Sequence, residues 1–540
     1  MELTKWNVWH TYSYYFIDLV DDLHDVADKL VQSQLVVSAF HSEGIAWYYS
    51  GEQVVKSTVE IDRVGYESTA NVKLPKVEDP YALECILQSA RMRVAEMGIL
   101  NERVQETLPY VRAHLAECTI QLKDKLILLY PQIKIYDNGA FLVEFRTISP
   151  SGKYSIDALI DDNINLFTHI GENVELPPGI LKLYARYILY ENSKSPQIWF
   201  KAVKAVKEND RKINKEKYTH ENNFEFEYIS LGYGVSIKDI FDYICGALIV
   251  ALDVSYQSPF PMKKKQYNFG SHWTGRPSIY LTKYADQPFN ASEILTKFKI
   301  ELNKIMGRTT SEGISANFLG QDLRVFDDFS LYVNKALTLF VFSRRLKHYT
   351  RIHKLSKSYH QAFKDPNLDE VYCLHQIKVE IIDFAYTSYW RMLERSTLSI
   401  TSVTEILREK EQLIALENIL EECSIHGELN DFFKHSWKIL SFDKMRANIE
   451  QNFVLKIARL SELRGLNIQR FGWILSILFG LSGAVNLAQN FVQPLWRQSG
   501  MTPRIGEDLF KIYSTAIAAG IMLILIIVVW FITVGRKPKA

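Results

Sequence analysis

The sequence predicts a mixed α/β domain at the N-terminus, a stalk of long helices and a C-terminal transmembrane hairpin of two helices. Prolines and glycines punctuate residues 1–320, where short alternating apolar stretches are typical of β-strands. No proline occurs over 367–493, which favours long helices in the segment 325–470. Two apolar runs without a charged residue, at about 471–492 and 512–535, are predicted to span a membrane.

Length and charge limit the function classes. A chain of 540 residues is too long for one ordinary hydrophobic core, so several domains are expected. The net charge of +1 gives the molecule no strong attraction for nucleic acid, and no direct nucleic-acid binding is expected. The five cysteines form no CxxC pair, which indicates a reducing compartment without disulfides or a zinc site.

Local patterns identify strands in the first part of the chain. Apolar residues alternate over 131–145 on both sides of Asn138 and Gly139, a pair that is typical of a type I′ hairpin turn. The segments 224–230 and 278–284 are rich in aromatic and β-branched residues and are also predicted to be strands.

Two Ser-x-x-acid patterns predict where helices begin. Ser236 and Asp239 precede an apolar run, so we expect a helix over 236–252. Ser402 and Glu405 form a second capping box, which predicts the start of a helix in the stalk.

One long helix is predicted from about residue 429 into the first apolar run. Gly427 is interpreted as the end of the preceding helix, and no helix breaker follows before residue 490. Six apolar residues recur every three or four positions and form one stripe: Met445, Ile449, Phe453, Ile457, Leu460 and Leu463. At about 1.5 Å per residue, this helix would be roughly 90 Å long.

The charges that flank the two apolar runs predict the membrane topology. The second run has 24 residues without a charge, and a membrane span needs about 20. Basic residues precede the first run and also follow the second, in the tail 536–540. The positive-inside rule then places both termini in the cytoplasm of a two-pass protein in the cell (inner) membrane.

The first apolar run carries a stripe of residues on one helical face that includes polar side chains. A polar side chain that faces lipid is costly, so several copies around an axis would turn the stripe inward and line a pore. The alternative is that the polar groups hydrogen-bond the second span within one hairpin. The predicted pore-lining residues are Leu475, Phe479, Ser482 and Asn486.

The C-terminal part resembles CorA-type divalent cation channels, in which a cytoplasmic domain and a long stalk helix lead into two spans. The family signature Gly-Met-Asn corresponds here to Gly483-Ala484-Val485-Asn486, so only the asparagine is kept in place. The resemblance implies a homo-oligomer, a pentamer in the family, in which Asn486 contacts a hydrated ion. It also implies a divalent cation such as Mg²⁺ as permeant or regulatory ion.

In its large N-terminal part, residues 1 to about 470, the chain resembles a divergent CorA-like branch that is associated with type III CRISPR systems. This resemblance implies an antiviral membrane channel that opens in response to a nucleotide second messenger, such as the conjugate of S-adenosylmethionine with AMP. One alternative is a magnesium or divalent cation transporter. A second alternative is a membrane-tethered sensor or scaffold without a pore.

Two segments could bind such a nucleotide. The loop 258–277 combines basic and aromatic residues, which could pair with phosphate and stack on adenine, although a solvated surface loop has the same composition. Gly232 and Gly234 precede a predicted helix N-terminus, where backbone amides favour phosphate, although a plain tight turn would look the same. The candidate residues in the loop are Lys263, Lys264, Lys265, Tyr267, Trp273 and Arg276.

Enzyme signatures are absent from the sequence. It contains no GxxxxGK[ST], no HExxH and no GxSxG motif, so no catalytic residue is predicted. The histidines at 348, 353 and 360 lack the i, i+4 spacing of a helical metal site, so no metal ligand and no dedicated cofactor are predicted.

Overall fold

The computed structural model describes most of the chain. Its contacts divide the chain into two units, residues 1–399 with 407–450 and residues 400–406 with 451–540. The structure describes residues 1–16, 20, 22–63, 69–122, 125–166, 170–171, 173–192, 204, 207–208, 211, 225–226, 229–230, 235–253, 269–271, 276–311, 317–324, 326–345, 351–353, 370–400, 402–422, 427–499 and 506–534.

The first unit is built around one large mixed sheet, to which fourteen of the described strands belong. Its main path runs β19-β20-β18-β1-β10-β9-β7-β2-β3-β4, and every neighbouring pair is antiparallel except β18 with β20. These strands are β1 (Glu2–Phe16), β2 (Ser38–His41), β3 (Ile45–Ser50), β4 (Gln53–Thr58), β7 (Tyr110–His114), β9 (Lys125–Tyr136), β10 (Ala140–Ile148), β18 (Arg276–Tyr284), β19 (Phe329–Val333) and β20 (Thr338–Phe342).

Shorter strands extend the sheet or form small separate ones. Off the main path lie β8 (Cys118–Leu122), β11 (Tyr154–Ser155), β13 (Asn173–Glu175) and β17 (Phe269–Ser271). The small sheets hold β5 (Glu60–Arg63), β6 (Thr69–Lys73), β12 (Ile170–Gly171), β14 (Glu225–Phe226), β15 (Ile229–Ser230), β16 (Val235–Ser236) and β21 (Arg351–His353).

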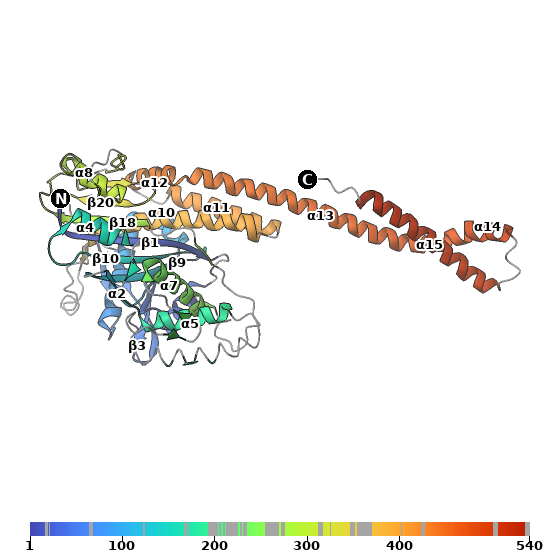
Figure 1. The fold of residues 1–540 in the computed structure, drawn as a ribbon, viewed down its shortest axis with the longest axis horizontal. Helices are drawn as coiled ribbons and strands as arrows, with labels where there is room; N and C mark the ends of the chain where they lie inside the picture. The colour runs from blue at the N-terminus through green and yellow to red at the C-terminus, as the bar shows by residue number, and fades with distance from the viewer. Residues whose placement is uncertain are drawn as a thin grey trace. The chain divides into compact units, whose positions relative to one another are not determined.

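Helices cover both faces of the sheet (Figure 1). On one face α7 packs against aromatic strand residues, and Phe241 meets Phe145 edge to face with ring centroids 4.4 Å apart. The other face lies under α2 and α10 and carries polar side chains. The helices are α1 (Leu23–Gln32), α2 (Pro80–Ile99), α3 (Glu102–Thr107), α4 (Ile156–Leu159), α5 (Pro178–Asn192), α7 (Ile237–Leu252), α8 (Ile294–Gly307), α10 (Glu370–Glu394), α11 (Val403–Glu422), α12 (Gly427–Leu440), α13 (Phe442–Leu487), α14 (Gln493–Gln498) and α15 (Glu507–Val534).

Several local predictions are confirmed. The capping box of α7 is present in both directions, since Ser236 and Asp239 bond each other's backbone N–H. The Ser402 hydroxyl accepts the Glu405 amide at 3.2 Å, at the start of α11. The strand expected over 278–284 is β18, whereas the described residues of 224–230 form two two-residue strands, β14 and β15.

The β9–β10 hairpin is confirmed, but its turn is of another type. Ile135 pairs with Phe141, so the loop has three residues, Asp137 to Gly139. The Gly139 amide donates to the Tyr136 carbonyl at 3.1 Å, and φ of Gly139 is 88°, while Asn138 is not at positive φ. This geometry matches a type I turn followed by a left-handed glycine, rather than the predicted type I′ turn.

The helical region begins later, and is more interrupted, than the sequence predicts. The strands β19 and β20 belong to the main sheet although they lie after residue 325. Gly427 is the first residue of α12 rather than the end of a helix. The long helix is broken at Ser441, whose φ is 60°, so α13 begins at Phe442. A left-handed residue cannot continue a right-handed helix, and the break therefore separates α12 from α13.

The predicted membrane hairpin is corrected. Within the part of the chain that the structure describes, no helix combines the length and apolarity that crossing a membrane requires. The predicted stripe of α13 is buried only in its first part, at Met445, Ile449 and Phe453, whereas Ile457 is exposed and Leu460 is half-buried. Charged residues lie between the buried ones, as in an amphipathic helix. The CorA-like fold with spans at 471–492 and 512–535, and the two-pass location in the inner membrane, are therefore wrong on this finding. The side chains of 463–484 and 525–534 are outside the described set.

Candidate functional site

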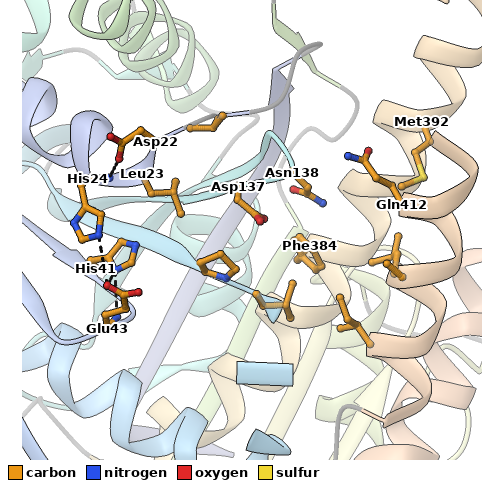
Figure 2. Close-up of a pocket in the computed structure, with 16 residues that line it drawn as sticks. Asp22, Leu23, His24, His41, Glu43, Asp137, Asn138, Phe384, Met392 and Gln412 are labelled. Atoms are coloured by element: carbon orange, nitrogen blue, oxygen red, sulfur yellow. Dashed lines mark hydrogen bonds and ion pairs between the residues drawn. The ribbon is translucent and has the colours of Figure 1, made fainter. Parts of the chain in front are cut away.

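A cavity of about 600 Å³ lies in the first unit, between one end of the central strands of the sheet and the helices α10 and α11. Figure 2 shows two histidines and Glu43 at one end and side chains of α10 and α11 at the other. Its polar lining residues are Asp22, His24, His41, Glu43, Asp137, Asn138 and Gln412. Its apolar lining includes Leu23, Leu108, Phe384, Met392, Leu416 and Ile419.

The start of α1 positions His24. Asp22 is the N-cap of this helix, and its carboxylate accepts the amides of His24 at 2.8 Å and of Asp25 at 3.1 Å. The hydrogen bond from Asp25 is the main reason why the pKa of Asp22 lies below its usual value. Because the cap holds the first turn, the His24 side chain is presented to the cavity wall.

The turn between β2 and β3 positions the other two members of this cluster. His41 ends β2, where it pairs with Ile45 of β3 and Val111 of β7. Gly44 has a φ of 84°, and its amide donates to the His41 carbonyl at 2.9 Å. A Cβ at Gly44 would lie 2.9 Å from the Val59 carbonyl, so this tight turn requires glycine.

Both imidazole rings lie close to one carboxylate oxygen of Glu43. Oε2 of Glu43 lies 3.4 Å from Nε2 of His24 and 3.6 Å from Nδ1 of His41. The two imidazole rings stack with centroids 4.3 Å apart. Burial lowers the pKa of His41 to about 4, and the nearby His24 adds to this effect, so His41 is neutral at pH 7.

The hairpin tip and two helices form the opposite wall. The Asn138 amide donates to the Ser388 hydroxyl of α10 at 2.8 Å. Arg391 of α10 donates to the Gln412 side chain of α11 at 3.3 Å and to the Phe16 carbonyl of β1 at 3.1 Å. Burial raises the pKa of the Asp137 carboxyl above its usual value. This wall is therefore the place where the sheet, α10 and α11 contact one another.

A buried ionic network lies next to the cavity, and Leu108 and Phe384 line both the cavity and a small cleft at the network. Arg112 donates two hydrogen bonds to the Glu380 carboxylate, at 3.0 and 2.7 Å. Lys134 bridges Glu380 at 2.8 Å and Glu96 at 2.9 Å. The sheet is thus tied to both α10 and α2 by paired charges.

Two carboxyl groups of this network have pKa values that shift in opposite directions, because different charges surround them. Burial alone would raise the pKa of Glu380, but the positive charges of Arg112 and Lys134 hold it below its usual value. Glu144 is also fully buried and accepts from Thr11 at 3.2 Å and from Gln376 at 2.8 Å. Burial, together with the negative charge of Glu380, raises the pKa of Glu144 to about 8.

Of the ligand-binding residues predicted from the sequence, Arg276 is the one within the described residues. It is buried, pairs with Asp383 of α10 at 3.2 Å and donates to the Thr338 hydroxyl at 2.8 Å. Its guanidinium is therefore used within the fold and does not line the cavity. The other candidates lie outside the described residues: Lys263, Lys264, Lys265, Tyr267, Trp273, Gly232 and Gly234.

The predicted pore-lining residues all fall in α13. Leu475, Phe479 and Ser482 are helical, but their side chains are outside the described set. Asn486 is exposed in the last turn of this helix. Their role in a pore remains a prediction.

Sequence reasoning missed the cluster of His24, His41 and Glu43. The two histidines are 17 positions apart and belong to a helix and a strand, so no short motif joins them. The local signals were an Asp-x-His pair at a helix start and a His-x-Glu-Gly turn, neither of which indicates a site alone.

No family model, no curated protein and no solved structure matches the chain. The resemblance to CorA-type channels therefore has no support from these comparisons.

Proposed function

We propose that this chain is a small-molecule sensor whose ligand occupies the cavity between the strand ends of the sheet and the helices α10 and α11. The observation that carries the proposal is the composition of the cavity wall, since one ligand would touch β-strand turns and two helices at once. The volume of about 600 Å³ lies within the range of about 300–1,000 Å³ that small-molecule sites have.

The charges of the wall favour a ligand with positive charge or many hydrogen-bond donors. Asp22, Glu43 and Asp137 contribute carboxyl groups, and no lysine or arginine is among the described residues that line the cavity. With no metal ion bound, a polyphosphate would meet carboxylates without a compensating cation. The Gln412 side chain accepts from Arg391 through its oxygen, and its amide nitrogen can donate to a ring nitrogen of a base.

The nucleotide second messenger expected from the sequence is a candidate ligand of this class. The conjugate of S-adenosylmethionine with AMP carries a sulfonium cation and two adenine rings, which suit carboxylates, amides and the ring of Phe384. Binding would act on the protein only if the ligand had different affinities for two arrangements of α10 and α11. The ion channel and the cation transporter expected from the sequence remain predictions, and this proposal does not include them.

Thermal unfolding of the full chain tests the proposal with four compounds: the conjugate, S-adenosylmethionine, AMP and ATP. We expect the two sulfonium compounds to raise Tm in a concentration-dependent manner and ATP to leave it unchanged, because binding to the folded state stabilises it by mass action. The Asp137→Asn variant removes one carboxylate of the wall and should weaken binding about tenfold. The exposed Glu52→Gln serves as the matched control.

Two results would contradict the proposal. One is a Tm that none of the four compounds changes. The other is an equal shift in wild type and Asp137→Asn, because the ligand would then bind elsewhere.

A further inference from the structure

We infer that His24, His41 and Glu43 form a binding site for a divalent transition metal ion of the zinc type at the wall of the cavity. This inference goes beyond the proposed sensor function and does not depend on it. Among the residues that the structure describes, these three form a group whose ligand atoms all lie within 4.8 Å of one another.

The chemistry of the donors selects the class of metal. Two imidazole nitrogens and one carboxylate oxygen are borderline ligands that suit Zn²⁺, Co²⁺ or Ni²⁺, whereas Mg²⁺ and Ca²⁺ prefer oxygen ligands. Two histidines with one glutamate also form one of the three-ligand sets of catalytic zinc sites, in which the fourth position is open.

The spacing of the donors fits a tetrahedral ion. Ligand atoms at about 2.0–2.1 Å from a tetrahedral centre are separated by about 3.3–3.4 Å. The Glu43 oxygen lies 3.4 Å from His24 Nε2 and 3.6 Å from His41 Nδ1, so two of the three edges are already near this length. The third edge joins a nitrogen of His24 to a nitrogen of His41, and these ligand atoms lie within 4.8 Å of each other. Rotation of the two imidazole rings would shorten this edge.

The backbone holds the donors before any ion binds. His41 is fixed by strand pairing on both sides, and Glu43 follows it in the glycine turn. His24 is fixed by the Asp22 cap and stacks against His41. One existing contact competes with the ion, because His41 Nδ1 accepts the Glu43 amide at 3.2 Å. Metal binding at this nitrogen would replace that long hydrogen bond.

The position of the cluster gives the ion an accessible fourth ligand. All three residues line the cavity, so the open coordination position would face its interior. A water molecule or a donor atom of a small ligand would complete the tetrahedron there.

Titration of the full chain with zinc chloride, after removal of metals by a chelator, tests the site. We expect one Zn²⁺ per chain by calorimetry, and Co²⁺ should give the intense visible absorption of a tetrahedral ion. Glu43→Gln and His24→Gln should each weaken Zn²⁺ binding at least 100-fold. Both side chains are partly exposed, so these variants should fold, and His435→Gln on α12 is the matched control.

The outcomes separate clearly. One ion per chain that is lost in both variants and kept in His435→Gln would support the site. Absence of Zn²⁺ binding in the wild type, or equal affinity in wild type and Glu43→Gln, would overturn it. Repeating the Tm measurements with the four sulfonium and nucleotide compounds on chelator-treated protein shows whether the sensor proposal fails separately.

Discussion

At the scale of single residues, the buried charges under α10 decide how the sheet and this helix hold together. Arg112 and Glu380 are 0% exposed, and Lys134 is 3% exposed. A charge in such a place is tolerated only because its partner is present. The network therefore makes the contact between sheet and helix specific, and it makes the loss of one member costly.

Replacement of Glu380 by glutamine should destabilise the protein strongly. The amide keeps the shape of the side chain but leaves Arg112 and Lys134 without their shared counter-charge, which costs about 3–5 kcal/mol of unfolding free energy. Urea unfolding at pH 7 measures the loss. Glu421→Gln, an exposed residue of α11, is the control and should change stability by less than about 0.5 kcal/mol. Equal stability of the two variants would contradict the role of the network.

Replacement of Glu144 by glutamine should alter the pH dependence of stability. The pKa of Glu144 is raised from 4.5 to about 8 in the folded state, so the folded state holds a proton that the unfolded state releases. The stability that this proton contributes is complete below pH 4.5 and is lost as the pH rises through about 8. Urea unfolding between pH 5 and pH 9 should therefore show a smaller decline in Glu144→Gln than in wild type. Parallel curves would refute the prediction.

At the scale of elements, turns and breaks follow from a few backbone conformations. Ser441 separates α12 from α13 at a φ of 60°, a conformation that costs an L-residue about 1–2 kcal/mol. The Ser441 carbonyl nevertheless accepts the amides of Lys444 and Met445, at 3.1 and 3.2 Å, so the break also caps the first turn of α13.

Glycine at position 441 should stabilise the protein. Glycine adopts positive φ without the steric cost, although it loses more freedom on folding, so a net gain of about 0.5–1 kcal/mol is expected. Ser441→Val should lower stability instead, because a β-branched residue is disfavoured there. Thermal unfolding of the two variants measures both effects. If the helix were continuous from 427 to 487, Ser441→Gly would instead be less stable than Ser441→Val.

At the scale of the whole molecule, the candidate site depends on chain segments that are far apart in the sequence. The cavity joins the start of α1, the β2–β3 and β9–β10 turns of the sheet and two helices beyond residue 370. The hydrogen bonds between Arg112 and Glu380 span 268 positions. All of these residues belong to the first unit.

The sequence by itself determined the features that arise from neighbouring residues. The β9–β10 hairpin, the capping box of α7, the Ser402 cap of α11, the strand β18 and the buried first part of the α13 stripe all follow from patterns within a few positions. Capping and side-chain alternation are short-range interactions, so a local pattern contains the information that they need.

Only the tertiary structure decided the polar face of the sheet, the cluster of His24, His41 and Glu43, and the break at Ser441. Arg112, Lys134 and Glu380 look like solvated surface residues in the sequence, and burial becomes visible only when α10 covers the sheet. The histidines meet because α1 packs beside β2 and β3, not because of their spacing. Contacts between residues that are far apart in the sequence form only when the entire fold packs, so a local stretch of sequence does not reveal them.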